Sequence, residues 1–228
     1  MNLDEYAKQR KQLLAEIAED MVATADLTGR SALSERVART IAEVPRHEFV
    51  TEAETLYAYY NTALPIGCGQ TISQPFIVAL MTDLLDPALE HEVLEVGTGS
   101  GYQAAVLSRL VHSVYSIEVI PDLADLARSK LHRLGYQNVC VKAGDGAAGW
   151  PEHAPYDGIV VTAAATELPP ALVEQLKPGG RMVIPLGNTA RYQELTLVTK
   201  SATGEVRDRP VLPVAFVPLV SGVPAKGE

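Results

Sequence analysis

The sequence predicts an α/β protein: a doubly wound, mostly parallel β-sheet with an N-terminal helical extension and an antiparallel edge. Three observations support this fold class. Apolar runs of strand length alternate with helix-forming segments over residues 93–185, which is typical of a parallel sheet covered by helices. Residues 3–44 instead carry apolar side chains at helical spacing. The last two apolar runs, 195–199 and 214–219, have no helix between them, which favours an antiparallel pair.

Two helices are expected before the sheet. Apolar side chains recur every three or four residues over 3–22, as in a helix with one buried stripe. A second stripe over 33–44 ends at Pro45, which has no backbone N–H and disfavours helix in the residue before it. The aromatic-rich residues 56–60 lead into 64–75, a stretch dense in Gly, Pro, Ser and Thr. We expect it to be a long loop of the kind that often carries function.

A third helix is expected to start near Ser73 and to end before Asp86-Pro87. A serine at a helix entrance is a good N-cap, worth about 1 kcal/mol, so capping competes with any functional use of this hydroxyl. Residues 221–228 are expected to be a frayed tail. The remaining predicted elements are strand 93–96, helix 103–110, strand 113–119, helix 121–134, strand 139–142, strand 156–162, helix 169–176 and strand 181–185.

Length and composition limit the possible classes of protein. The 228 residues suit one domain with N-terminal helices and a loop (1–72), an α/β core (73–200) and a C-terminal edge strand and tail (201–228). The net charge is -9 without a Lys/Arg cluster, so neither nucleic acid nor an anionic membrane is expected as a partner. Cys68 and Cys140 match no metal or disulfide pattern. With no signal peptide or membrane span in the pattern, we expect a monomeric cytoplasmic protein.

A glycine turn follows the strand 93–96. Gly97, Gly99 and Gly101 tolerate positive φ and have no Cβ, so a ligand can approach the main chain. In the dinucleotide pattern G-x-G-x-x-G the last glycine lies one residue later and serves a helix N-terminus that binds a pyrophosphate. The tighter spacing found here suits S-adenosylmethionine, which carries no phosphate.

Two acidic residues strengthen this interpretation. Glu118 ends the next strand, roughly twenty residues past the turn, where an acceptor for ribose hydroxyls is expected. Asp145 lies between Gly144 and Gly146 after a third strand, where it can accept from an adenine amino group. Taken singly, Glu118 could be a solvated charge and Asp145 a turn former. In this order they favour a nucleotide-type cofactor, with an NAD-dependent oxidoreductase as the alternative that the glycine spacing argues against.

These motifs resemble those of bacterial protein-L-isoaspartate O-methyltransferases over nearly the whole chain. The discriminating segment is Thr71-Ile72-Ser73-Gln74-Pro75, because many unrelated methyltransferases share the glycine turn. Asn61 departs from the family pattern, in which an acidic residue is expected at this position. The other matching segments are 44–50, 64–67, 69–70, 93–102, 144–146, 154–157, 177–181 and 216–219.

The resemblance implies methyl transfer from S-adenosylmethionine to the free α-carboxylate of L-isoaspartyl residues in damaged peptides and proteins, which starts repair through a succinimide. It implies Ser73 as the active-site residue and no metal. Gln193 also matches a family binding residue. The implied cofactor-binding residues are Gln70, Thr71, Ile72, Glu95, Gly97, Gly99, Gly101, Glu118, Asp145 and Gly146.

This chemistry agrees with the residue types. An α-carboxylate has a pKa near 3.5, is ionised at neutral pH and needs no general base. A neutral hydroxyl at Ser73 then suffices to orient it by proximity. The peptide main chain is expected along the loop 57–74. Two further alternatives stay open: a family member that modifies one aspartate of a partner peptide, and a catalytically silent binding module.

Overall fold

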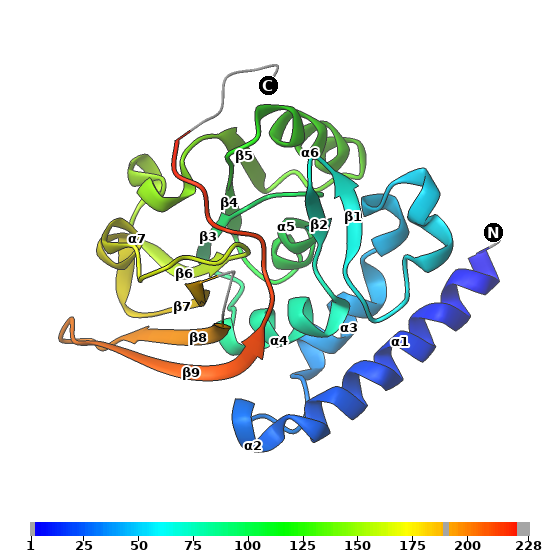
Figure 1. Ribbon diagram of the computed structural model, residues 1–228, viewed down its shortest axis with the longest axis horizontal. Helices are drawn as coiled ribbons and strands as arrows, with labels where there is room; N and C mark the ends of the chain where they lie inside the picture. Colours follow the sequence, from blue (N-terminus) through cyan, green and yellow to red (C-terminus); the bar gives the residue numbers. More distant parts are fainter. Residues whose placement is uncertain (1–2, 189–191, 223–228) are drawn as a thin grey trace.

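Seven strands form a mixed sheet in the order β5-β4-β3-β6-β7-β8-β9 (Figure 1). The computed structural model describes residues 3–188 and 192–222, so the tail expected at 221–228 lies outside the described residues from 223 onwards. β5, β4, β3, β6 and β7 are parallel neighbours, whereas β8 is antiparallel to both β7 and β9. This confirms the predicted fold class. The strands are β3 (Glu92–Val96), β4 (Ser113–Glu118), β5 (Val139–Ala143), β6 (Tyr156–Val161), β7 (Leu176–Asn188), β8 (Tyr192–Lys200) and β9 (Val206–Val214).

Each face of the sheet has its own apolar core, because successive side chains of a strand point to opposite faces. On β3, Val93 belongs to one core and Leu94 to the other. The N-terminal helices, α4, α5 and α6 contribute to the first core, and α7 contributes to the second. Helix coverage is therefore heavier on one face than on the other. These helices are α4 (Pro75–Leu85), α5 (Tyr102–Ser108), α6 (Pro121–Arg133) and α7 (Pro170–Gln175).

The N-terminal extension packs against α4. Arg46, which follows its last helix, is fully buried, and burial lowers the pKa of its guanidinium to about 10. Its Nε donates to the Ala58 carbonyl at 2.9 Å and its Nη2 to the Thr62 carbonyl at 3.3 Å. Arg46 therefore holds the two ends of the segment that contains Asn61. The extension comprises α1 (Leu3–Ala23), α2 (Ala25–Thr28), α3 (Glu35–Glu43) and the 3-10 turns η1 (Arg46–Phe49) and η2 (Glu52–Tyr57).

The segment 57–74 contains a β-hairpin, which the sequence interpretation as an irregular loop missed. β1 (Leu64–Gly67) pairs antiparallel with β2 (Gln70–Ile72). The two turn residues, Cys68 and Gly69, both have positive φ (52° and 67°), as a tight hairpin requires. A non-glycine residue such as Cys68 rarely adopts this conformation, so the turn has no strong local signal.

The second edge strand was predicted at the wrong place. The structure forms β9 from Val206–Val214, and the apolar run 214–219 leaves the sheet after it. β9 carries Arg207, Asp208 and Arg209 together with Pro210, a composition that suits an exposed edge and blunts further pairing. The apolar run was mistaken for the strand because it is partly buried elsewhere, where residues 217–219 line the cavity at the carboxyl ends of the parallel strands.

Candidate active site

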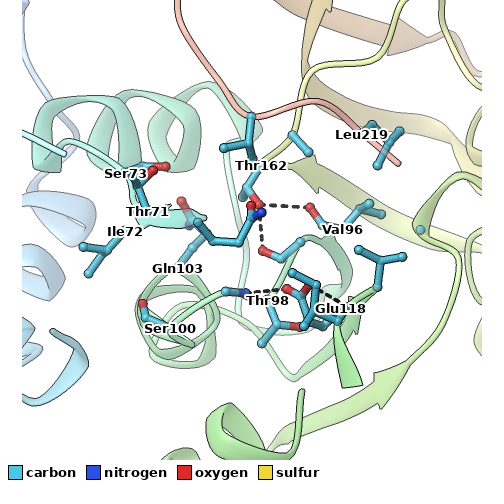
Figure 2. A pocket seen from close by; sticks show the side chains of 18 of the residues that line it. Thr71, Ile72, Ser73, Val96, Thr98, Ser100, Gln103, Glu118, Thr162 and Leu219 are labelled. Atoms are coloured by element: carbon cyan, nitrogen blue, oxygen red, sulfur yellow. Dashed lines mark hydrogen bonds between the residues drawn. The ribbon is translucent and has the colours of Figure 1, made fainter. Parts of the chain in front are cut away.

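A cavity of about 280 Å³ lies at the carboxyl ends of β3, β4 and β6 (Figure 2). The strand order reverses at β3, since β4 and β6 lie on its two sides. Ligands of open α/β sheets bind at such switch points. The segment 217–220, here called the strap, lies over one side of the cavity. It is held there by backbone hydrogen bonds between Ala164 and both Val217 and Leu219, each 2.8 Å long.

The glycine turn is shaped by close packing as well as by conformation. Gly97 has φ 94°, and a Cβ on it would lie 2.3 Å from the Thr162 Oγ1. That hydroxyl is oriented by the Val96 and Gly97 carbonyls, at 3.1 and 2.6 Å. A Cβ on Gly146 would lie 2.3 Å from a Val96 methyl group. Both glycines therefore let the main chain line the cavity where a side chain would not fit.

Glu118 braces the turn from the end of β4. Its Oε2 accepts from the Gly99 N–H at 2.7 Å and its Oε1 from the Ile120 N–H at 3.1 Å. The carboxylate also lines the cavity and is only 5% exposed. Each carboxylate oxygen can accept a second hydrogen bond. Glu118 can thus hold the turn and receive ligand hydroxyls together.

Glu95 lies behind the turn, and its side chain does not line the cavity. It is fully buried and accepts a hydrogen bond from the Ser116 hydroxyl, which also contacts the Thr98 hydroxyl at 2.6 Å. Burial raises the pKa of Glu95 to about 8, and the nearby charge of Glu118 acts in the same direction. Glu95 is therefore mainly neutral at pH 7, and it supports the turn through Ser116, which contacts Thr98.

Replacing Glu95 with glutamine is expected to flatten the pH dependence of stability. Between pH 4.5 and about 8 the folded chain holds a proton on Glu95 that the unfolded chain has released. The free energy of unfolding therefore falls as pH rises through this window, by up to about 1.4 kcal/mol per pH unit from this group. Urea unfolding across the window measures it. Equal pH slopes for Glu95→Gln, wild type and the exposed control Glu52→Gln would contradict the expectation.

Gly101 and Asp145 also lie outside the cavity lining. Gly101 has φ 89°, and a Cβ there would come within 3.3 Å of Leu131, so it serves the contact between α5 and α6. Asp145 accepts from the Ala147 N–H and from the Gly222 N–H, both at 2.9 Å. It thus ties the start of a short 3-10 turn to the end of the described chain, and its contact with adenine stays a prediction.

Ser73 does not cap α4, so its hydroxyl is not used as the N-cap that the sequence offered as an alternative role. The N-cap residue is Gln74, whose side chain makes no capping hydrogen bond, and Pro75 occupies the first turn. The Phe76 N–H is instead bonded by the Asn61 Oδ1 at 3.1 Å. Within residues 3–188 and 192–222, the Ser73 hydroxyl has no hydrogen-bond partner, and it is partly exposed on the cavity wall.

Asn61 joins α1 to α4. Its Nδ2 donates to the Asp20 carboxylate at 2.7 Å while its Oδ1 accepts from Phe76. Only an amide can make both bonds, since an aspartate would set two carboxylates against each other. The departure from the resemblance at this position is thus explained by the partner on α1.

Replacing Asn61 with alanine is expected to lower the free energy of unfolding by about 1 kcal/mol, the usual cost of a lost helix cap. Urea unfolding measures this loss. Asn61→Asp keeps an acceptor for the Phe76 N–H but places a second carboxylate beside Asp20, so it should also lower the free energy of unfolding. Adding Asp20→Asn supplies an amide donor to the new carboxylate, and the stability of the double variant should return to that of the wild type. An unchanged stability of Asn61→Ala would show that the bridge contributes nothing.

A second cavity, of about 680 Å³, adjoins the first. It lies between the end of α1, with Asp20 and Thr24, and the segment 212–217. Four residues line both cavities: Thr71, Ser73, Thr162 and Val217. The two cavities therefore meet at the end of β2.

Gln193 holds the segment that precedes the strap. Its Nε2 donates to the Phe216 carbonyl at 3.0 Å, and its Oε1 accepts from the Phe216 N–H at 2.6 Å. Being 95% buried on β8, it fixes where residues 216–220 cross the sheet. Its side chain lines neither cavity.

The structure brings most of the predicted site residues together and adds others. The additions come from α4, from the glycine turn and the start of α5, from the ends of strands and from the strap, and sequence spacing identified none of them. Thr162 alone had a usable signal, since it directly follows β6 at the edge where ligands bind. The predicted residues that line the first cavity are Gln70, Thr71, Ile72, Ser73, Gly97, Gly99, Glu118 and Gly146, and the additions include Val78, Met81, Thr98, Ser100, Tyr102, Gln103, Ile120, Thr162 and the strap.

A parallel sheet with a glycine turn, an acidic strand end and a cavity at the switch point defines the class: the chain is a Rossmann-like S-adenosylmethionine-dependent methyltransferase. Residues 18–224 match the sequence profile of the family described as protein-L-isoaspartate(D-aspartate) O-methyltransferase. The chain belongs to this family, so it is a carboxyl methyltransferase.

Relatives and solved structures agree. The protein-L-isoaspartate O-methyltransferase 2 of Syntrophobacter fumaroxidans is 59% identical over 96% of this chain and 89% of its own length. The corresponding enzyme 1 of Cupriavidus necator is 56% identical over 95% and 84%. A solved protein-L-isoaspartate O-methyltransferase superposes with a TM-score of 0.81 at 32% identity, covering 94% of this chain and 67% of the other. A Plasmodium falciparum structure in complex with S-adenosyl-L-homocysteine (TM-score 0.73, 24% identity, 90% and 97% covered) shares the fold.

The site fits S-adenosylmethionine, the cofactor of the family. A Cβ on Gly97 or Gly146 would push against the cavity wall, so both positions keep room for a flat ligand along the main chain. Glu118 supplies a carboxylate beside that wall. In the part of the chain that the structure describes, no His, Cys, Asp or Glu residues gather in a group that could hold a metal, and no helix has the length and hydropathy needed to cross a bilayer.

Proposed function

We propose that the chain transfers a methyl group from S-adenosylmethionine to the free α-carboxylate of L-isoaspartyl residues in damaged peptides and proteins. In the product, the adjacent backbone amide nitrogen attacks the ester carbonyl and expels methanol without further catalysis, and water then opens the resulting succinimide partly to normal aspartate. One observation carries the proposal: the two cavities share a wall at Ser73. A cofactor in the first cavity and a peptide in the second would meet there.

We assign the cofactor to the first cavity. Gly97, Gly99 and Gly146 would hold it along the main chain, and Glu118 would accept from its ribose hydroxyls. Gln70, Thr71 and Ile72 would cover it from the hairpin side. Bound S-adenosylmethionine supplies an electrophilic methyl group on a cationic sulfur.

We assign Ser73 to orienting the substrate. Its unpartnered hydroxyl can donate to one oxygen of the incoming α-carboxylate and aim the other oxygen at the first cavity. The substrate carboxylate is already ionised, so no residue needs to remove a proton. The composition of the shared wall supports this, because Thr71, Ser73, Thr162 and Val217 carry no titratable group. Thr162 is committed to main-chain carbonyls, which leaves Ser73 and Thr71 to contact the substrate.

We assign the peptide to the second cavity, which modifies the expectation of binding along 57–74 alone. That segment supplies part of the lining, through Thr62, Ala63, Thr71, Ser73 and Gln74. The rest of the lining comes from Asp20 and Thr24 around the end of α1, from Phe76 and Ile77 of α4, from Thr162 and from the segment 212–217. Substrates of many sequences would then bind in a groove built from several separate parts of the chain.

The test compares two forms of one peptide. In the isoaspartyl form the aspartate is joined to the next residue through its side-chain carboxyl, and in the aspartyl form through its α-carboxyl. We expect transfer of labelled methyl to the isoaspartyl form at a rate far above that to the aspartyl form. Equal rates would contradict the proposal. A panel of unrelated isoaspartyl peptides separates general repair from modification of one partner, since a dedicated enzyme would accept only one member.

We further propose that residues 1–228 act as one domain, as a monomer in the cytoplasm and without nucleic acid. The net charge of -9 and the two exposed free cysteines, Cys68 and Cys140, support this. Light scattering during size-exclusion chromatography tests the monomer. A mass of two chains would contradict it.

A further inference from the structure

Gln103, on α5, carries a buried acceptor with no partner. The side chain is 94% buried and lines the first cavity. Its Nε2 donates to the Thr82 hydroxyl oxygen at 2.9 Å. Its Oε1 has no hydrogen-bond partner among the described residues and is shielded from solvent. Leaving a carbonyl in this state costs free energy unless a ligand donates to it.

The orientation of this amide is fixed by α4. The Thr82 hydroxyl donates to the Val78 carbonyl at 2.7 Å, so its oxygen is left as an acceptor. A flipped Gln103 would place Oε1 against that oxygen and lose the hydrogen bond. Nε2 must therefore face Thr82, and Oε1 is the atom left for a ligand.

The place of Gln103 in the cavity indicates which end of the cofactor it faces. Its partner Thr82 belongs to α4, the helix that starts just after Ser73, and Val78 and Met81 of α4 line the same wall. Figure 2 shows Gln103, Thr71 and Ser73 on one side of the cavity and Glu118 with Leu219 on the other. With the ribose at Glu118, the amino-acid end extends towards Gln103.

We propose that Gln103 Oε1 accepts a hydrogen bond from the α-ammonium group of the amino-acid end of S-adenosylmethionine. That end carries a carboxylate, which only accepts, and an ammonium, which only donates. Gln103 Oε1 is an acceptor, so of these two groups it can pair only with the ammonium. The bond is charge-assisted and lies in a buried site, where such bonds are strongest. The inference rests on the proposed cofactor site and adds a residue that recognises one functional group.

Calorimetry with the demethylated product tests this without turnover. The two ligands are S-adenosylhomocysteine and an analogue in which hydrogen replaces the α-amino group. In Gln103→Met, which keeps the length but not the acceptor, we expect the affinity for S-adenosylhomocysteine to fall at least about tenfold. The affinity for the analogue should not change. Equal losses for both ligands, or no loss for either, would overturn the inference.

A second variant serves if Gln103→Met does not fold. Gln103→Glu keeps an acceptor of the same length and adds charge, so it should increase the preference for S-adenosylhomocysteine over the analogue. A reduced preference would overturn the inference. Wild-type protein that binds neither ligand would instead contradict the cofactor site itself, so the two failures are distinguishable.

Discussion

Replacing Ser73 with alanine is expected to lower kcat on the order of 100-fold, the usual effect of losing the group that orients a reactant. The hydroxyl has no other hydrogen bond in the described chain, and α4 is bonded by Asn61 instead. Thermal stability should therefore be unchanged. Steady-state kinetics with an isoaspartyl peptide, together with a melting curve, measures both effects.

Two variants control this expectation. Ser73→Thr keeps a hydroxyl and should retain more activity than Ser73→Ala. Thr71→Val removes the other uncommitted hydroxyl of the shared wall, because the one at Thr162 is bound to Val96 and Gly97. A large loss in Thr71→Val with full activity in Ser73→Ala would transfer the orienting function to Thr71.

Replacing Gly97 with alanine is expected to weaken S-adenosylhomocysteine binding by more than about 100-fold, as calorimetry on the variant and the wild type would measure. Two effects combine at this position. Its φ of 94° is strained for alanine, at a cost of about 1–2 kcal/mol. The new Cβ would also lie 2.3 Å from the Thr162 Oγ1, so the turn or β6 must move. Either movement displaces the main chain that the cofactor would contact.

Gly135→Ala is the matched control, because Gly135 has φ 84° but free space around its Cβ position. It should lose stability without losing affinity for the ligand. Adding Thr162→Ala to Gly97→Ala removes the contact and leaves the conformational strain, so part of the affinity should return. Full binding by Gly97→Ala alone would show that the turn does not shape the cofactor site.

The elements predicted correctly are those with a strong local pattern. The strand before Gly97 and the strand that ends at Glu118 are buried on both faces of the sheet. Such strands are short apolar runs, which can be recognised in the sequence. The helix stop at Pro45 follows from a missing N–H and needs no knowledge of the fold. The hairpin at Cys68 and the charged strand β9 escaped prediction, because both depend on pairing with distant residues.

The site shows the same division. Glycine spacing and Glu118 predicted a cofactor region that coincides with the first cavity, whereas Asp145 lies outside its lining. The segment around Ser73 indicated which methyltransferase family the chain resembles. Glu95 lies behind the turn although its neighbour Val96 lines the cavity, since successive side chains of β3 point to opposite faces of the sheet. Gln103 gave no signal at all. Its unpartnered oxygen exists only because Thr82, on another helix, fixes the amide.

By itself the sequence determined the fold class, the type of cofactor and the family, because periodicity, glycine spacing and short motifs are properties of neighbouring residues. Only the tertiary structure decided that Ser73 is free to act, that the strap 217–220 crosses the sheet and that two cavities share a wall. Those features need side chains from α1, β2, β6 and the C-terminal segment in one place. Chain folding, and no local pattern, brings them together.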